Sequence, residues 1–255
     1  MRTALLLSGN PRFSADFDSQ IHNLQNSEVD WYITFWNREF GWDPKLSENW
    51  CNLKTAAQVR DKIKPHLPPN HKIKFVEILT PGIFGEIPKE YEPYNSTPKN
   101  VWDQYKSLQY CFQWCQELGS YDLIIRSRTD VGLSAPIDLK LAYESLLKWW
   151  PNAIYIPNNQ RYGYPPNFND QFAIGLPHVM SCYCNAVDEF DSLYKNGIKY
   201  NPEYLIQTAL SKRNITWPET RFEIVRDPLH WVPIEHGKWK DCLLYTSPSP
   251  RDATL

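Results

Sequence analysis

The 255-residue sequence has no apolar run of about 20 residues, the length that a membrane-spanning helix needs. Its first apolar run, TALLL, is interrupted by Ser-Gly-Asn-Pro before it reaches the length of a signal peptide. Charge of either sign is in small excess only, since 27 basic and 29 acidic residues leave a formal net charge of −2. These features argue against a transmembrane segment and against a general binder of nucleic acid or anionic membranes.

The cysteines lack the paired spacing of a zinc site. There are six of them, at positions 51, 111, 115, 182, 184 and 242. Cys111 and Cys115 stand four residues apart in a predicted helix, which favours packing as small apolar side chains over metal binding. We therefore expect a protein of a reducing compartment, located in the cytoplasm.

The last residues of the chain differ in character from the rest. The stretch CLLYTSPSPRD, from Cys242 to Asp252, corresponds to one reading frame of a transposon-type sequencing adapter. We interpret residues 242–255 as adapter read-through, and a Ser/Pro-rich disordered tail is the alternative. The fold prediction therefore covers residues 1–241.

Short apolar runs alternate along the chain with segments of helical spacing. Strands are predicted at residues 3–7, 29–36, 72–79, 123–125, 153–156 and 172–175, with an edge strand within 215–225. Helices are predicted at residues 13–26, 55–63, 98–118, 137–150, 178–194 and 202–213. This alternation predicts a single α/β domain with a mostly parallel sheet and helices on both faces.

The most informative stretch is YDLIIRSRTDVGL, residues 121–133. Its apolar run predicts a buried strand, after which Arg126, Arg128 and Asp130 follow at every second position. On extended backbone these side chains point the same way, so we expect them at the carboxyl edge of the sheet, where ligands bind. There a carboxylate can hold a divalent cation, and guanidinium groups can bind phosphate. An Arg–Asp surface pair after an ordinary strand is the alternative.

Two other segments place small or acidic residues beside predicted strands. Ser8, Gly9 and Arg12 lie in SGNPR, directly after the first strand, where a small-residue turn lets a ligand approach the backbone. The glycine-rich dinucleotide motif GxGxxG is absent there, and a plain strand-to-helix turn is the alternative. Asp170 lies in NDQFAIG, just before a short apolar strand, and is either a second carboxylate at the cleft or a local cap.

These segments, taken in order, resemble a known family. The series SGNPR, ITFW, WDQYKSLQYCFQW, YDLIIRSRTDV, NDQFAIG and PEYLIQTAL is similar to GT-A-type glycosyltransferase-like proteins of polysaccharide and lipopolysaccharide biosynthesis, of the bacterial or large-virus type. The resemblance covers roughly residues 3–215. It implies a Rossmann-like GT-A domain, a nucleotide-sugar donor, and transfer of the sugar to a hydroxyl of a glycan or lipid-linked acceptor.

The resemblance also implies roles for individual residues. Asp130 matches the last acidic position of the family's metal motif, which binds Mn²⁺ or Mg²⁺, although Arg128-Thr129-Asp130 replaces the usual two aspartates around one residue. Donor-binding roles are implied for Ser8, Gly9, Arg12, Arg126, Arg128 and Asp130.

Asp170 is placed near the sugar or acceptor. It is the implied base of an inverting reaction, and it would only position a hydroxyl in a retaining one. Because the acidic motif is reduced, a noncatalytic nucleotide- or carbohydrate-binding module is the alternative function.

Overall fold

A computed structural model of the chain describes residues 1–9, 20–21, 23–24, 27–37, 53–80, 82–87, 91–92, 97–129, 131–133, 135–157, 168–218, 220 and 224–225. The predictions for Arg12, Asp130, most of the helix at 13–26 and the tail at 242–255 lie outside these residues.

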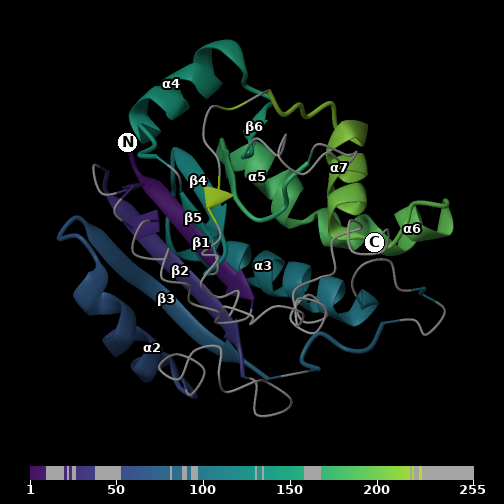
Figure 1. The fold of residues 1–255 in the computed structure, drawn as a ribbon, viewed down its shortest axis with the longest axis horizontal. Helices are drawn as coiled ribbons and strands as arrows, with labels where there is room; N and C mark the ends of the chain where they lie inside the picture. Colours follow the sequence, from purple (N-terminus) through teal and green to yellow (C-terminus); the bar gives the residue numbers. More distant parts are fainter. Residues whose placement is uncertain are drawn as a thin grey trace, which may run out of the picture.

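The described strands form one six-stranded sheet and one two-stranded sheet. The larger sheet has the order β3-β2-β1-β4-β7-β6 (Figure 1). Its strands are β1 (Thr3–Gly9), β2 (Val29–Trp36), β3 (His71–Leu79), β4 (Leu123–Ser127), β6 (Ile154–Tyr155) and β7 (Ala173–Gly175). The first four in spatial order are parallel, and β7 is antiparallel to β4 and β6. The smaller sheet pairs β5 (Gly132–Leu133) with β8 (Ile224–Val225). The prediction of a mostly parallel sheet is confirmed.

Helices cover both faces of the larger sheet. The α-helices are α2 (Ala56–Ile63), α3 (Pro98–Leu118), α4 (Leu139–Trp149), α5 (Pro177–Cys184), α6 (Phe190–Lys195) and α7 (Pro202–Lys212), and the short 3₁₀ helices are η2 (Lys64–His66) and η4 (Ala186–Glu189). Figure 1 shows α2 beside β3 and, on the other side of the molecule, α5 and α7 beyond β4. Among the described helices, none combines the length and the apolar character needed to cross a bilayer.

The continuous helix predicted at 178–194 is wrong, because the structure divides this segment into α5, η4 and α6. The break falls at Asn185, whose backbone leaves the helical region with φ −94° and ψ 5°. The Asn185 side chain accepts a hydrogen bond from Gln109 of α3. Asparagine is a poor helix former because its side chain hydrogen-bonds readily outside a helix, so this contact favours the break.

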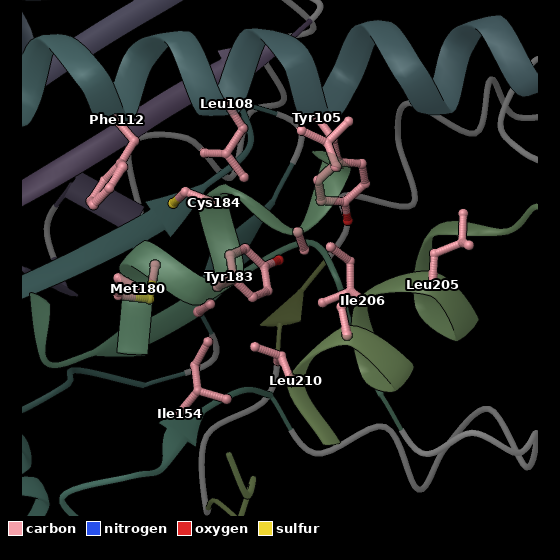
Figure 2. Packing of buried hydrophobic residues seen from close by; sticks show 14 of the residues in the cluster. Tyr105, Leu108, Phe112, Ile154, Met180, Tyr183, Cys184, Leu205, Ile206 and Leu210 are labelled. Carbon is pink, nitrogen blue, oxygen red and sulfur yellow. The ribbon is translucent and has the colours of Figure 1, made fainter. Parts of the chain in front are cut away.

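Two apolar cores lie on opposite faces of the sheet. The first core packs α3, α5 and α7 against one face, and Figure 2 shows one of its members from each helix, Leu108, Met180 and Leu210. The second core packs α2 and α4 against the other face. Along β4 the side chains alternate between the cores, with Ile124 in the first and Ile125 in the second.

Cys111, Cys115 and Cys184 are free thiols buried in the first core. Burial raises the pKa of the Cys111 thiol to about 12. The predicted role of Cys111 and Cys115 as small apolar packing residues is confirmed.

Candidate active site

The carboxyl ends of β1 and β4 and the entry into β7 meet at one edge of the sheet. Leu7 pairs with Ser127 across β1 and β4, so Ser8 and Gly9 lie level with the residues that follow β4. Arg126 pairs with Ala173 across β4 and β7, and because these strands are antiparallel, Asp170 precedes β7 at the same edge. β1 and β7 flank β4, which separates them by two strand spacings, roughly 10 Å.

Gly9 ends β1 in a conformation that favours glycine. Its φ is +110°, a backbone angle that residues with a side chain rarely adopt. A Cβ added there would meet no atom of the described residues within 4 Å. The neighbouring Ser8 hydroxyl is buried, and it has no hydrogen-bond partner in the described part of the chain. Gly9 therefore ends β1 beside a buried hydroxyl that no described residue binds.

Replacing Gly9 by alanine is expected to lower the free energy of unfolding by about 1–2 kcal/mol, because alanine is strained at this φ. Urea denaturation followed by tryptophan fluorescence measures the loss. Since the added methyl group has no neighbour to clash with, the loss reports the backbone conformation alone. An unchanged transition midpoint would contradict the assignment.

Asp170 is held at the edge by α3 and α5. The Tyr105 hydroxyl and the Gln104 Nε2 donate to its Oδ2 at 2.8 and 2.9 Å, and the Tyr183 hydroxyl donates to its backbone carbonyl at 2.9 Å. Asp170 is only 3% exposed, and no described residue donates a hydrogen bond to its Oδ1. The protein therefore fixes one carboxylate oxygen, and the other receives no hydrogen bond from the described residues.

The position of Tyr105 follows from the chain topology. α3 connects β3 to β4, which lie parallel in the sheet, so it runs antiparallel to the strands and its first half lies at their carboxyl ends. Tyr105 belongs to the apolar stripe of α3 together with Leu108 and Phe112. Figure 2 shows the hydroxyls of Tyr105 and Tyr183 directed into the space between α3, α5 and α7. Two core residues, Tyr105 and Tyr183, thus donate hydrogen bonds from their hydroxyls to Asp170.

Both phenols stay protonated at neutral pH. Burial raises the pKa of Tyr105 well above its ordinary value, and the charge of Asp170 adds to the rise while Arg126 opposes it. Burial likewise raises the pKa of Tyr183, and there too Arg126 acts in the opposite direction. These effects place the positive charge of Arg126 next to the cluster formed by Tyr105, Asp170 and Tyr183.

Arg126 lies inside the sheet, whereas the sequence predicts it just beyond the end of the strand. The strand does not end at Ile125 but continues to Ser127, because Arg126 still pairs with Leu6 of β1 and Ala173 of β7. Its side chain is fully buried, and its three nitrogens have no hydrogen-bond partner among the residues that the structure describes. Arg128, the next residue predicted to point the same way, is half-buried beyond the strand.

Glu203 is a member of the site that sequence reasoning did not assign. It stands in the first turn of α7, which begins with Asn201 as N-cap and Pro202 at its first position. Its Oε2 is buried without a hydrogen-bond partner in the described part of the chain. Burial first, and the negative charge of Asp170 second, raise the pKa of Glu203 to about 7, while Asn201 and Arg128 oppose the rise. An acidic residue in a first helical turn is common, so the sequence alone gave no signal for this role.

The described residues do not by themselves fit a divalent cation. They contain no group of three or more His, Cys, Asp or Glu side chains that could hold a metal ion. At this edge the two carboxylates, Asp170 and Glu203, lie near the guanidinium groups of Arg126 and Arg128, whose charge opposes a cation. The predicted metal site therefore depends on Asp130, outside the described residues.

No protein-family model and no curated protein matches the chain. Solved structures that are similar to it include a putative nucleotide-diphospho-sugar transferase from Desulfovibrio desulfuricans, with 12% identity, a TM-score of 0.41, and coverage of 86% of this chain and 81% of that one. The glycosyltransferase GlyE of Streptococcus pneumoniae has 11% identity, a TM-score of 0.44, and coverage of 86% and 46%. Mouse xyloside xylosyltransferase 1 has 11% identity, a TM-score of 0.47, and coverage of 86% and 85%.

Proposed function

We propose that the protein is a glycosyltransferase that moves a sugar from a nucleotide-sugar donor to an acceptor hydroxyl. The observation that carries this proposal is the position of Asp170, fixed by Tyr105 and Gln104 at the sheet edge where β1 and β4 end. Ligands of open α/β sheets bind at this edge. The sequence resemblance carried by RSRTD and NDQFAIG supports the same function. The finer proposal is a glycan or lipid-linked acceptor in polysaccharide synthesis.

The turn after β1 and the residues after β4 are proposed to hold the donor. Gly9 lets the nucleotide approach the backbone closely, because no side chain stands there. Cleavage of the sugar–phosphate bond leaves negative charge on the nucleoside diphosphate. Arg128, at the end of β4, supplies positive charge near the place where that charge develops. Arg12 and a divalent cation at Asp130, Mn²⁺ or Mg²⁺, are proposed to add to it.

Asp170 is proposed to act on the sugar or acceptor. In an inverting reaction a carboxylate must take the proton of the acceptor hydroxyl, and the Oδ1 of Asp170 has no donor among the described residues that would compete. In a retaining reaction no such base is needed, and the same oxygen accepts a hydrogen bond from a sugar hydroxyl. Both roles need an oriented carboxyl group, and the hydrogen bonds to its Oδ2 fix that orientation.

A noncatalytic binding module is the second candidate function. The observation that favours it is the burial of the charged residues of the site, since Arg126 is fully buried and Asp170 nearly so. A protein that only binds a nucleotide or sugar needs no carboxylate open to an incoming acceptor. The two functions differ in whether the donor is consumed.

Incubation with Mn²⁺, a panel of nucleotide sugars and a panel of glycan acceptors tests the proposal. We expect release of the nucleoside diphosphate from at least one donor, and loss of release with EDTA or in Asp130→Ala. Thermal stabilisation by UDP with no release from any donor would favour the binding module. Absence of both stabilisation and release would overturn the proposed function.

A further inference from the structure

Two ionisable side chains from distant segments carry buried polar atoms that no described residue binds, and both lie in the surroundings of Asp170. Arg126 comes from β4 and Glu203 from the first turn of α7. Within the described residues, neither the three nitrogens of Arg126 nor the Oε2 of Glu203 has a hydrogen-bond partner. Asp170 acts electrostatically on Glu203, and Arg126 acts on both tyrosines that bond to Asp170. Buried polar atoms are paired in nearly all native proteins, so a cluster of this kind indicates polar groups of a ligand.

We infer that Glu203 is a second ligand-binding carboxyl of this site, which hydrogen-bonds one hydroxyl of a sugar whose adjacent hydroxyl bonds to Asp170. The inference rests on the proposed function and names the chemistry of its substrate: a sugar that carries two neighbouring free hydroxyls, on the donor or on the acceptor. The free Oε2 of Glu203 and the free Oδ1 of Asp170 are the atoms that would meet them.

The protonation of Glu203 suits this role. A protonated carboxyl donates a hydrogen bond and an ionised one only accepts, whereas each sugar hydroxyl does both. Burial and the charge of Asp170 keep a proton on Glu203 up to about pH 7, its pKa. Asp170 and Glu203 therefore form a donor–acceptor pair that matches two adjacent hydroxyls.

The other charged groups around α7 are engaged elsewhere. Of the described elements that pack against α7, η4 carries Glu189, which pairs with Arg213, and α6 carries Asp191, which pairs with Lys195 at 2.8 Å. On α5, the Tyr183 hydroxyl donates to the Asp170 carbonyl. The charges that act on Glu203 are those of Asp170, before β7, and Arg128, after β4.

Calorimetric titration of the full chain with UDP, UDP-glucose, UDP-galactose, UDP-N-acetylglucosamine, and free glucose and galactose tests this inference. For the wild type we expect at least one sugar-bearing probe to bind about tenfold more weakly at pH 8 than at pH 6, because Glu203 loses its proton over that range. Glu203→Ala should weaken that probe roughly tenfold at pH 6 and leave UDP unchanged. Glu203→Gln, which keeps a donor at all pH values, should bind it equally at both. A response with the UDP-sugars places the diol on the donor, and one with the free sugars places it on the acceptor.

Glu189→Gln is the matched control, since it changes a carboxyl on the neighbouring η4 that already has a partner, Arg213. It should behave as the wild type. Wild-type affinity of Glu203→Ala for every sugar, beside a wild type that turns over a donor, would overturn this inference and leave the proposed function standing. A wild type that binds no nucleotide sugar overturns both. If Glu203→Ala does not fold, Glu203→Gln decides alone: a pH dependence like that of the wild type contradicts the inference.

Discussion

Replacing Arg126 by methionine is expected to raise the melting temperature by a few degrees and to lower turnover at least tenfold. Methionine is unbranched and flexible, so it can follow the path of the arginine stem through the core. The two effects have opposite signs because burial of the guanidinium lowers the stability of the fold, whereas its positive charge beside the site supports turnover.

The stability gain follows from two opposing magnitudes. Burial of an ion costs several kcal/mol, and donors left without acceptors add about 1–3 kcal/mol. Against this stands the attraction to Asp170, but no salt bridge within 4.0 Å joins Arg126 to a described carboxylate. Across a longer gap at an effective dielectric near 20, that attraction is worth less than about 4 kcal/mol. The net gain of roughly 1–2 kcal/mol corresponds to a few degrees in a protein of this size.

The loss of turnover follows from the electrostatics of the site. Arg126 is a positioning residue, because its charge lies beside the tyrosines that fix Asp170. Removing this charge changes the field around the two tyrosines that hold Asp170, so turnover should fall although the fold becomes more stable. A residue that only fills the core would leave turnover unchanged.

Thermal denaturation and initial rates between pH 5 and 9 measure both effects. Arg60→Met is the matched control, because Arg60 donates to the Ile73 carbonyl at 3.2 Å, far from the site. It should lose a little stability and keep its turnover. A destabilised Arg126→Met with wild-type turnover would show that Arg126 is an ordinary core residue with a partner outside the described residues.

Sequence patterns predicted the bounds of strands and helices correctly where neighbouring residues determine those bounds. The bounds of β2 were predicted without error, because an apolar aromatic run is closed by polar residues on both sides. The start of α3 was also predicted, since Pro98 stands at its first position, although the Thr97 side chain makes no capping hydrogen bond. Within the predicted edge strand at 215–225, the described residues form the bridge of Thr216 to Ala153 and the strand β8.

The contacts that build the site were not visible in the sequence. Tyr105 lies on a helical apolar stripe like any core residue, and only the fold turns its hydroxyl to Asp170, 65 positions away. Arg126 was predicted to leave the core, but pairing on both sides keeps it inside the sheet. The sequence therefore indicates the edge and its charged residues, whereas the burial and partners of each side chain depend on long-range packing.

If Asp170 is the base of an inverting reaction, Asp170→Asn is expected to reduce turnover by about 10²- to 10⁴-fold, the usual contribution of a general base. Asparagine has the same shape, and its carbonyl oxygen can still accept from Tyr105 and Gln104, so the fold should survive. Its amide, however, cannot take a proton from an acceptor hydroxyl. Steady-state kinetics with the donor found in the nucleotide-sugar screen measures the loss.

The division of that loss between kcat and KM separates the two reaction types. In an inverting enzyme kcat falls and the KM of the acceptor changes little, because the proton is transferred only in the transition state. In a retaining enzyme KM rises and kcat is largely kept, since Asp170 then only positions a hydroxyl. Asp191→Asn is the control: Asp191 also accepts from a tyrosine hydroxyl, that of Tyr91, and it lies on α6 with Lys195 as a second partner. Wild-type kcat and KM in Asp170→Asn would remove Asp170 from the reaction, and the sheet edge would then have to act through Ser8, Arg128 and Asp130 alone.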